Sequence, residues 1–127
     1  MRLLIAERSP VLRKRLTRLF SDLGYFSLFA LAEELSAVQE IALEVKPDVI
    51  VMDIDFPNDT NLKILAELRD KIKNPKLLVL TESIEPRYTK QFHNSGVDMV
   101  FNKKDDLNKF IEHLNLLDDM IKKPSLV

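Results

Sequence analysis

Short apolar segments recur along the chain, and segments with helical periodicity separate them. The apolar residues in each segment are nearly continuous, which is typical of strands that are buried on both faces of a parallel sheet. The predicted strands are Arg2–Ala6, Tyr25–Phe29, Val49–Asp53, Leu77–Thr81 and Met99–Asn102, of which Tyr25–Phe29 is the weakest.

The intervening segments carry apolar stripes at helical spacing. The stripes are Leu12, Leu16, Leu19 and Leu23, then Leu65, Leu68 and Ile72, and finally Leu107, Phe110, Ile111, Leu114, Leu117 and Ile121. Pro10 and Pro86 stand where first helical turns should begin, and Gly24 can end the first helix. Strands that alternate with helices along the whole chain predict an α/β fold, in which helices cover both faces of a five-stranded parallel sheet.

The composition fits one domain, since 127 residues with 46% hydrophobic content can supply a core but leave no room for a second module. We expect a domain over residues 1–121 and a frayed tail at residues 122–127. The formal net charge of −1 suggests neither a nucleic acid nor a membrane as partner. The chain has no cysteine, which excludes thiol chemistry, and no segment resembles a signal peptide or a membrane span, so we expect a cytoplasmic protein.

Polar residues stand at the carboxyl ends of the predicted strands. They are Glu7 and Arg8 after the first strand, Asp53 and Thr81 at the ends of two central strands, and Lys103 after the last strand. Ligands of open parallel sheets bind at this edge, where the strand order reverses. A lone aspartate at a strand end is most often structural, but Asp53 together with Thr81 and Lys103 favours a functional site.

Four sequence motifs resemble the receiver domain of two-component response regulators. "PDVIVMDIDFP" is similar to the strand that carries the acceptor aspartate, and "LLVLTES" is similar to the strand that carries the switch Ser or Thr. "GVDMVFNK" is similar to the segment that ends in the family's lysine, and "SPVLRKRL" would open the first helix. The resemblance covers essentially the whole chain and implies a flavodoxin-like, doubly wound sheet with strand order 2-1-3-4-5.

The resemblance also implies roles for the residues at the sheet edge. Asp53 would accept a phosphoryl group, Thr81 would hydrogen-bond the phosphoryl oxygens, and Lys103 would pair with them. Mg²⁺ would be held by Glu7, by Asp53 and by the backbone carbonyl of Asp55. The chain would then be a stand-alone phosphorelay receiver and not an enzyme.

The family also implies partners. The phosphoryl group would come from a histidine kinase, a phosphotransfer protein or a small phosphodonor. The output would pass to a downstream protein or through self-association, without direct contact with nucleic acid or a membrane. The face that the family commonly uses would carry Arg87, Lys90, Gln91, Phe101, Lys104 and Lys109.

Several positions depart from the family's pattern. Arg8 occupies the second position of the acidic pair, so the Mg²⁺ site is expected to be weak or absent. Glu82 follows Thr81, where the family usually has a small residue that lets the phosphoryl group enter. Val100 stands where the family has an aromatic residue that reports the switch, and Lys104 replaces the proline that follows the lysine.

Arg8 leads to two opposite expectations. If its side chain turns into the pocket, the guanidinium can form paired hydrogen bonds with Asp53 and act as a built-in counterion. If Arg8 points to solvent instead, Glu7 becomes the direct metal ligand.

Two alternative functions remain open on the sequence. The chain could be a degenerate receiver that binds partners without being phosphorylated. It also resembles haloacid-dehalogenase-type phosphatases, because Asp53, Asp55, Thr81, Lys103 and the pair Asp105/Asp106 follow one another in the order that those enzymes use. Against the phosphatase, the acidic pair follows Lys103 closely and is better placed to cap the last helix.

Overall fold

The computed structural model describes residues 1–24, 28–32 and 34–122, with the backbone alone for residues 28–32. Five strands form one sheet in the order β2-β1-β3-β4-β5, and every neighbouring pair is parallel. The strands are β1 (Arg2–Ala6), β2 (Leu28–Ala32), β3 (Val49–Asp53), β4 (Lys76–Thr81) and β5 (Met99–Asn102). This is the doubly wound order predicted from the sequence. The prediction placed β2 at Tyr25–Phe29, of which residues 25–27 lie outside the described residues, and the observed strand is shifted toward the C-terminus.

Five α-helices and one short 3-10 helix connect the strands. They are α1 (Pro10–Leu23), η1 (Leu35–Ala37), α2 (Val38–Val45), α3 (Asp59–Lys71), α4 (Pro86–Asn94) and α5 (Leu107–Lys122). Ser9 caps α1 because its hydroxyl accepts a hydrogen bond from the backbone N–H of Leu12. Gly24 ends α1 with a φ of 73°, a conformation that glycine adopts at little cost.

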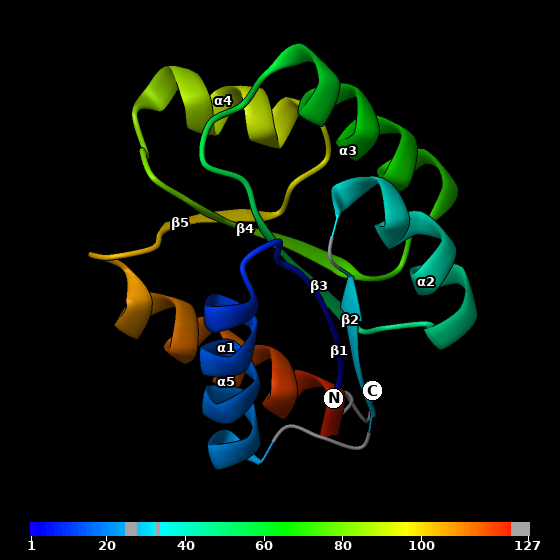
Figure 1. The fold of residues 1–127 in the computed structure, drawn as a ribbon, viewed down its shortest axis with the longest axis vertical. Coiled ribbons are helices and arrows are strands. Elements are labelled where there is room, and N and C mark those ends of the chain that lie inside the picture. The colour runs from blue at the N-terminus through cyan, green and yellow to red at the C-terminus, as the bar shows by residue number, and fades with distance from the viewer. Residues whose placement is uncertain (25–27, 33, 123–127) are drawn as a thin grey trace.

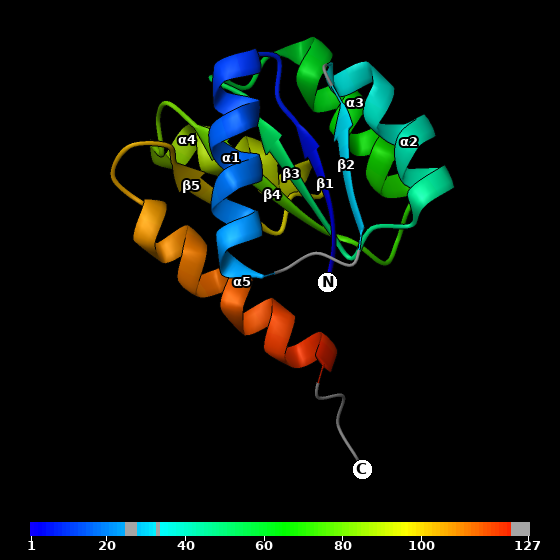
Figure 2. The ribbon, with the colours of Figure 1, turned by 60° about the horizontal axis from the view of Figure 1, so that its bottom comes forward.

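The helices form a layer on each face of the sheet (Figure 1). Helices α2, α3 and α4 cover one face, whereas α1 and α5 lie together on the other, as Figure 2 also shows. On the α1/α5 face, the ring centroids of Phe20 and Phe110 lie 6.2 Å apart, and those of Phe101 and Phe110 lie 5.5 Å apart. Each face of the sheet therefore has its own apolar core, and the site lies at the edge between the layers.

Strand β5 sends alternate side chains to opposite faces. Val100 packs against the core under α4, and Phe101 is buried, with 4% of its surface exposed, beneath α5. The prediction that Phe101 belongs to an exposed partner face is therefore wrong, because Phe110 and His113 cover its ring. The other residues of that predicted face are exposed, namely Arg87, Lys90, Gln91, Lys104 and Lys109.

Arg69 joins three segments at the amino edge of the sheet, away from the carboxyl strand ends. Its guanidinium donates to the carbonyl of Pro75 at 3.0 Å and to that of Gly96 at 3.1 Å, and it pairs with Asp98 at 2.8 Å. Asp98 in turn accepts a hydrogen bond from the backbone N–H of Leu77. This arginine thus ties α3 to the start of β4 and to the loop before β5.

Among the helices described, none combines the length and the apolar character needed to cross a membrane.

Candidate functional site

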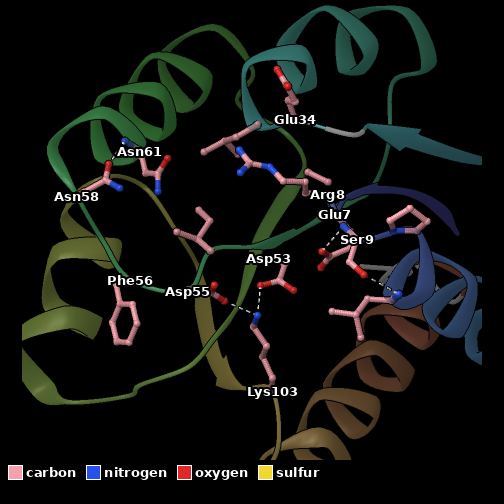
Figure 3. A pocket seen from close by; sticks show the side chains of 15 residues that line it. Glu7, Arg8, Ser9, Glu34, Asp53, Asp55, Phe56, Asn58, Asn61 and Lys103 are labelled. Atoms are coloured by element: carbon pink, nitrogen blue, oxygen red, sulfur yellow. Dashed lines mark hydrogen bonds and ion pairs between the residues drawn. The ribbon is translucent and has the colours of Figure 1, made fainter.

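A pocket of about 800 Å³ opens at the carboxyl ends of the strands (Figure 3). Its charged and polar lining comes from the residues after β1, the residue before η1, the end of β3 and the loop after it, the start of α3, and the residue after β5. These residues are Glu7, Arg8, Ser9, Glu34, Asp53, Asp55, Asn58, Asn61 and Lys103. The structure therefore brings together most of the residues that the sequence assigned to the site.

Lys103 is the cation closest to Asp53. Its Nζ lies 2.6 Å from Oδ1 of Asp53, and it also donates a hydrogen bond to the side chain of Asp55. A carboxylate oxygen of Glu82 lies farther away, at 3.7 Å. Burial disfavours the charge of Lys103, but its hydrogen bonds to Asp53 and Asp55 outweigh burial and raise its pKa. The ammonium is therefore held in place and fully charged at neutral pH.

Asp53 and Glu7 form an acidic pair at the base of the pocket. Glu7 is buried, with 5% of its surface exposed, and its Oε1 accepts a hydrogen bond from the backbone N–H of Ser9 at 3.0 Å. Its Oε2 is buried without a hydrogen-bond partner among the described residues. Burial and the neighbouring carboxylate of Glu7 together raise the pKa of Asp53 to about 7, although Lys103 opposes the rise. Asp53 therefore lacks enough positive charge nearby to stay fully ionised at neutral pH.

Thr81 is fully buried at the end of β4, and its hydroxyl is already engaged. It donates to the backbone carbonyl of Asp55 at 2.7 Å, and the backbone N–H of Glu82 donates to the same oxygen at 3.3 Å. Thr81 does not appear among the residues that line the pocket. Its hydroxyl would have to turn away from Asp55 to reach a phosphoryl oxygen on Asp53.

Arg8 lines the pocket but does not pair with Asp53. Its side chain is exposed, and in Figure 3 it extends over the pocket in the direction of Asn61 on α3. No ion pair joins it to any residue in the part of the chain that the structure describes. Of the two expectations for Arg8, the one in which it pairs with Asp53 is therefore wrong, because Lys103 occupies that place and Glu7 is the buried residue after β1.

The residues expected to hold magnesium fit the ion only in part. Glu7 offers a buried carboxylate oxygen without a partner, and Asp53 lies beside it, so these two side chains suit a cation. The carbonyl of Asp55 already accepts two hydrogen bonds. Among residues 1–24, 28–32 and 34–122, no cluster of three or more acidic, His or Cys side chains is arranged to hold a metal. Glu7 and Asp53 could therefore bind a metal ion, but the cationic side chains of Arg8 and Lys103 line the same pocket.

An exposed aromatic cluster lies at the rim of the pocket. The ring of Phe56, which is 51% exposed, meets the ring of Tyr88 edge-on at 6.0 Å. The guanidinium of Arg87 lies 4.7 Å from the centroid of the Tyr88 ring. Sequence reasoning missed this cluster, because nothing in the spacing of Phe56 and Tyr88 shows that the loop after β3 meets the start of α4.

The sheet order and the pocket define a doubly wound α/β protein with an acidic site at the carboxyl edge of its sheet. Residues 3–115 match the family described as the response regulator receiver domain. The chain belongs to this family. Asp105 and Asp106 do not line the pocket, and the Oδ2 of Asp106 accepts a hydrogen bond from the backbone N–H of Asn102, so nothing in the geometry favours the phosphatase alternative.

Relatives of known name and structure agree with this assignment. The DNA-binding transcriptional activator EvgA of Escherichia coli (strain K12) is 27% identical over 84 residues, which are 66% of this chain and 41% of EvgA. The chain thus spans less than half the length of that relative. A DNA-binding response regulator of the LuxR family from Staphylococcus aureus superimposes with a TM-score of 0.73 at 26% identity, covering 91% of this chain and 97% of the other. The chemotaxis protein CheY4 of Vibrio cholerae shares the fold, with a TM-score of 0.77, 19% identity and coverages of 91% and 97%.

Proposed function

We propose that this chain accepts a phosphoryl group on Asp53 and passes the resulting change of shape to a protein partner. The observation that carries the proposal is the Lys103–Asp53 pair, with 2.6 Å between Nζ and Oδ1, at the carboxyl edge of a receiver-family sheet. The donor would be the phosphohistidine of a histidine kinase or phosphotransfer protein, or a small phosphodonor.

The transfer needs a nucleophile and compensation of negative charge. A carboxylate oxygen of Asp53 attacks phosphorus, an oxygen–phosphorus bond forms, and the phosphorus–nitrogen bond to the donor histidine breaks, leaving its electron pair on the imidazole. Lys103 is already positioned to neutralise charge on the phosphoryl oxygens. Thr81 can donate to one of these oxygens once its hydroxyl leaves the carbonyl of Asp55. A magnesium ion held by Glu7 and Asp53 would supply additional positive charge when bound.

Three features of the site slow this chemistry. The carbonyl of Asp55 is hydrogen-bonded twice, the cationic Arg8 disfavours a magnesium ion in the pocket, and Glu82 adds a carboxylate beside Lys103. We expect magnesium to bind weakly and phosphorylation by a small-molecule donor to be slow.

Incubation with phosphoramidate and magnesium, followed by intact-mass spectrometry, tests the proposal. We expect the mass of one phosphoryl group to be added to the wild-type chain and not to the variant Asp53→Asn. Asp55→Asn is the matched control, because it removes a neighbouring carboxylate that also contacts Lys103 and leaves the nucleophile in place. Labelling that persists in Asp53→Asn would contradict the assignment of Asp53.

A second candidate function is a receiver-shaped module that binds its partner without phosphorylation. The buried, already bonded hydroxyl of Thr81 favours it, because the switch residue is locked in the resting arrangement. In either case the partner surface would include the exposed cations Arg87, Lys90 and Lys104. Binding of a partner that is unaffected both by phosphoramidate and by Asp53→Asn would support the second candidate over the first.

A further inference from the structure

Besides Lys103, the pocket contains the cationic side chain of Arg8, to which the proposed phosphoryl transfer assigns no contact. Of the described residues that line it, only Lys103 and Arg8 are cationic. Lys103 is shared between the side chains of Asp53 and Asp55, with Glu82 nearby. Arg8 makes no ion pair within the described part of the chain, even with the acidic residues that line the same pocket, such as Glu34. The guanidinium can therefore bind a new anion without first breaking an ion pair.

Phosphorylation of Asp53 would create such an anion in this pocket. A carboxylate with one negative charge would be replaced by a phosphoryl group of charge about −1.5 to −2. Glu7 lies beside it with a buried oxygen that has no hydrogen-bond partner among the described residues. Lys103 cannot supply all of the missing charge, because it is also bound to Asp55.

We propose that Arg8 binds the phosphoryl oxygens on Asp53 and so takes over part of the role of a metal ion. This inference rests on the proposed function. Guanidinium matches phosphate oxygens with two parallel hydrogen bonds and stays protonated at every relevant pH. The side chain is long, exposed and attached next to Glu7, at the carboxyl end of the strand adjacent to the one that carries Asp53. A rotation of its side chain in the pocket would bring the guanidinium toward Asp53 with no change in the backbone.

The consequence is a receiver whose phosphorylation depends less on magnesium than its acidic pocket suggests. When the metal is absent, Arg8 would neutralise negative charge on the transferred phosphoryl group. Its positive charge would also repel a metal ion at Glu7 and Asp53, and so weaken metal binding. Replacing Arg8 with an acid should have the opposite effect on both properties.

The test measures labelling by phosphoramidate with magnesium and with a chelator, together with magnesium affinity by calorimetry. The variants are Arg8→Gln, which removes the charge, and Arg8→Asp, which adds a carboxylate. The matched control is Arg15→Gln, which removes the same charge from an exposed position of α1 outside the pocket. In the chelator, Arg8→Gln should label at least about tenfold more slowly than wild type, the worth of one charge-assisted hydrogen bond. Arg8→Asp should bind magnesium more tightly and label only when magnesium is present.

A second measurement does not depend on rates. In the phosphorylated wild-type protein, the Nε–Hε NMR signal of Arg8 should be protected from exchange with water, and in the unphosphorylated protein it should not. Wild-type labelling that is abolished by the chelator, or equal labelling of wild type and Arg8→Gln in the chelator, would overturn the role of Arg8 while leaving Asp53 as acceptor. If no variant is labelled, including Arg8→Asp with magnesium, the proposed function itself fails, and the inference fails with it.

Discussion

The ammonium of Lys103 lies 2.6 Å from Oδ1 of Asp53 and also binds the side chain of Asp55. One lysine thus holds two carboxylates that are two positions apart in the chain. Asp53 ends β3, whereas Asp55 belongs to the loop that leads to α3. The lysine therefore fixes both the proposed phosphoryl acceptor and the start of the loop after β3.

Lys103→Met should impair both the site and the fold. It removes the ammonium, keeps most of the apolar stem, and leaves Asp53 and Glu7 without their nearest cation. We expect the phosphoramidate labelling rate to fall by at least about tenfold and the stability to fall by about 1 kcal/mol, because the pair is only partly exposed. Lys104→Met, at an exposed neighbouring position, is the control for urea unfolding and for labelling. Equal labelling of Lys103→Met and wild type would contradict the role of the lysine.

Asp53→Asn should stabilise the protein at neutral pH. The pKa of Asp53 is raised from 3.8 to about 7, so the folded state holds its proton more tightly than the unfolded state does. Stability contributed by the protonated group is therefore lost as the pH rises from about 4 to about 7. The amide cannot ionise and can donate to the unpartnered oxygen of Glu7, so we expect a gain of about 1–2 kcal/mol at pH 8 that shrinks toward pH 5.

Urea unfolding of wild type, Asp53→Asn and Asp55→Asn at pH 5 and pH 8 checks this expectation. Asp55 is the more exposed of the two carboxylates, with 61% of its side chain accessible, so its substitution should give no comparable pH-dependent gain. A gain for Asp53→Asn that is the same at both pH values would show that ionisation of Asp53 is not its cause.

His113 should make the protein less stable in mild acid. Burial lowers its pKa from 6.5, the charge of Lys76 lowers it further, and Asp98 partly compensates. The folded state then binds the proton less tightly than the unfolded state, so stability is lost as the pH falls below about 6.5. His113→Gln should reduce this loss between pH 7 and pH 5, measured by thermal unfolding. His93→Gln, at an exposed position of α4, is the comparison, and an equal effect of both variants would contradict the assignment to His113.

Gly96→Ala should destabilise the protein more than Gly24→Ala. Both glycines have positive φ, 99° and 73°, so each alanine costs about 1–2 kcal/mol in backbone strain. A Cβ at Gly96 would also lie 2.7 Å from Cβ and Cγ of Arg69, whereas one at Gly24 would meet no atom within 4 Å. We expect the difference to exceed about 1 kcal/mol in urea unfolding, because Arg69 also holds the carbonyl of Gly96. Equal losses of stability in the two variants would show that the Arg69 side chain moves away from the added methyl group at no cost.

Most of the fold was predictable because the strands are buried on both faces and therefore read as continuous apolar runs. The runs at Val49–Asp53 and Met99–Asn102 match their strands in full. The helix Val38–Val45 was not assigned, because its eight residues are too few to show a clear stripe. Strand β2 was placed too early, since the aromatic residues around Tyr25 drew the prediction toward the N-terminus.

The site was predictable as a set of residues but not as a set of contacts. Strand ends indicated that Asp53, Thr81 and Lys103 would lie near one another, and the Lys103–Asp53 pair follows from that. The partner of Arg8 did not follow, because two adjacent residues at a strand end point to different sides and the sequence does not say which one faces inward. The receiver resemblance assigned only the backbone carbonyl of Asp55 to the site, although its side chain also binds Lys103.

The aromatic contact at the rim of the pocket also gives the protein its own optical signal. The chain has two tyrosines and no tryptophan, and Tyr25 lies outside the described residues. Tyr88 lies against Phe56, which follows Asp55 directly, and beneath the charged group of Arg87. A movement of the loop after β3 would change the polarity around this phenol ring. Ultraviolet emission could then follow the state of Asp53 in real time, without a dye, and a Tyr25→Phe variant would assign the emission to Tyr88.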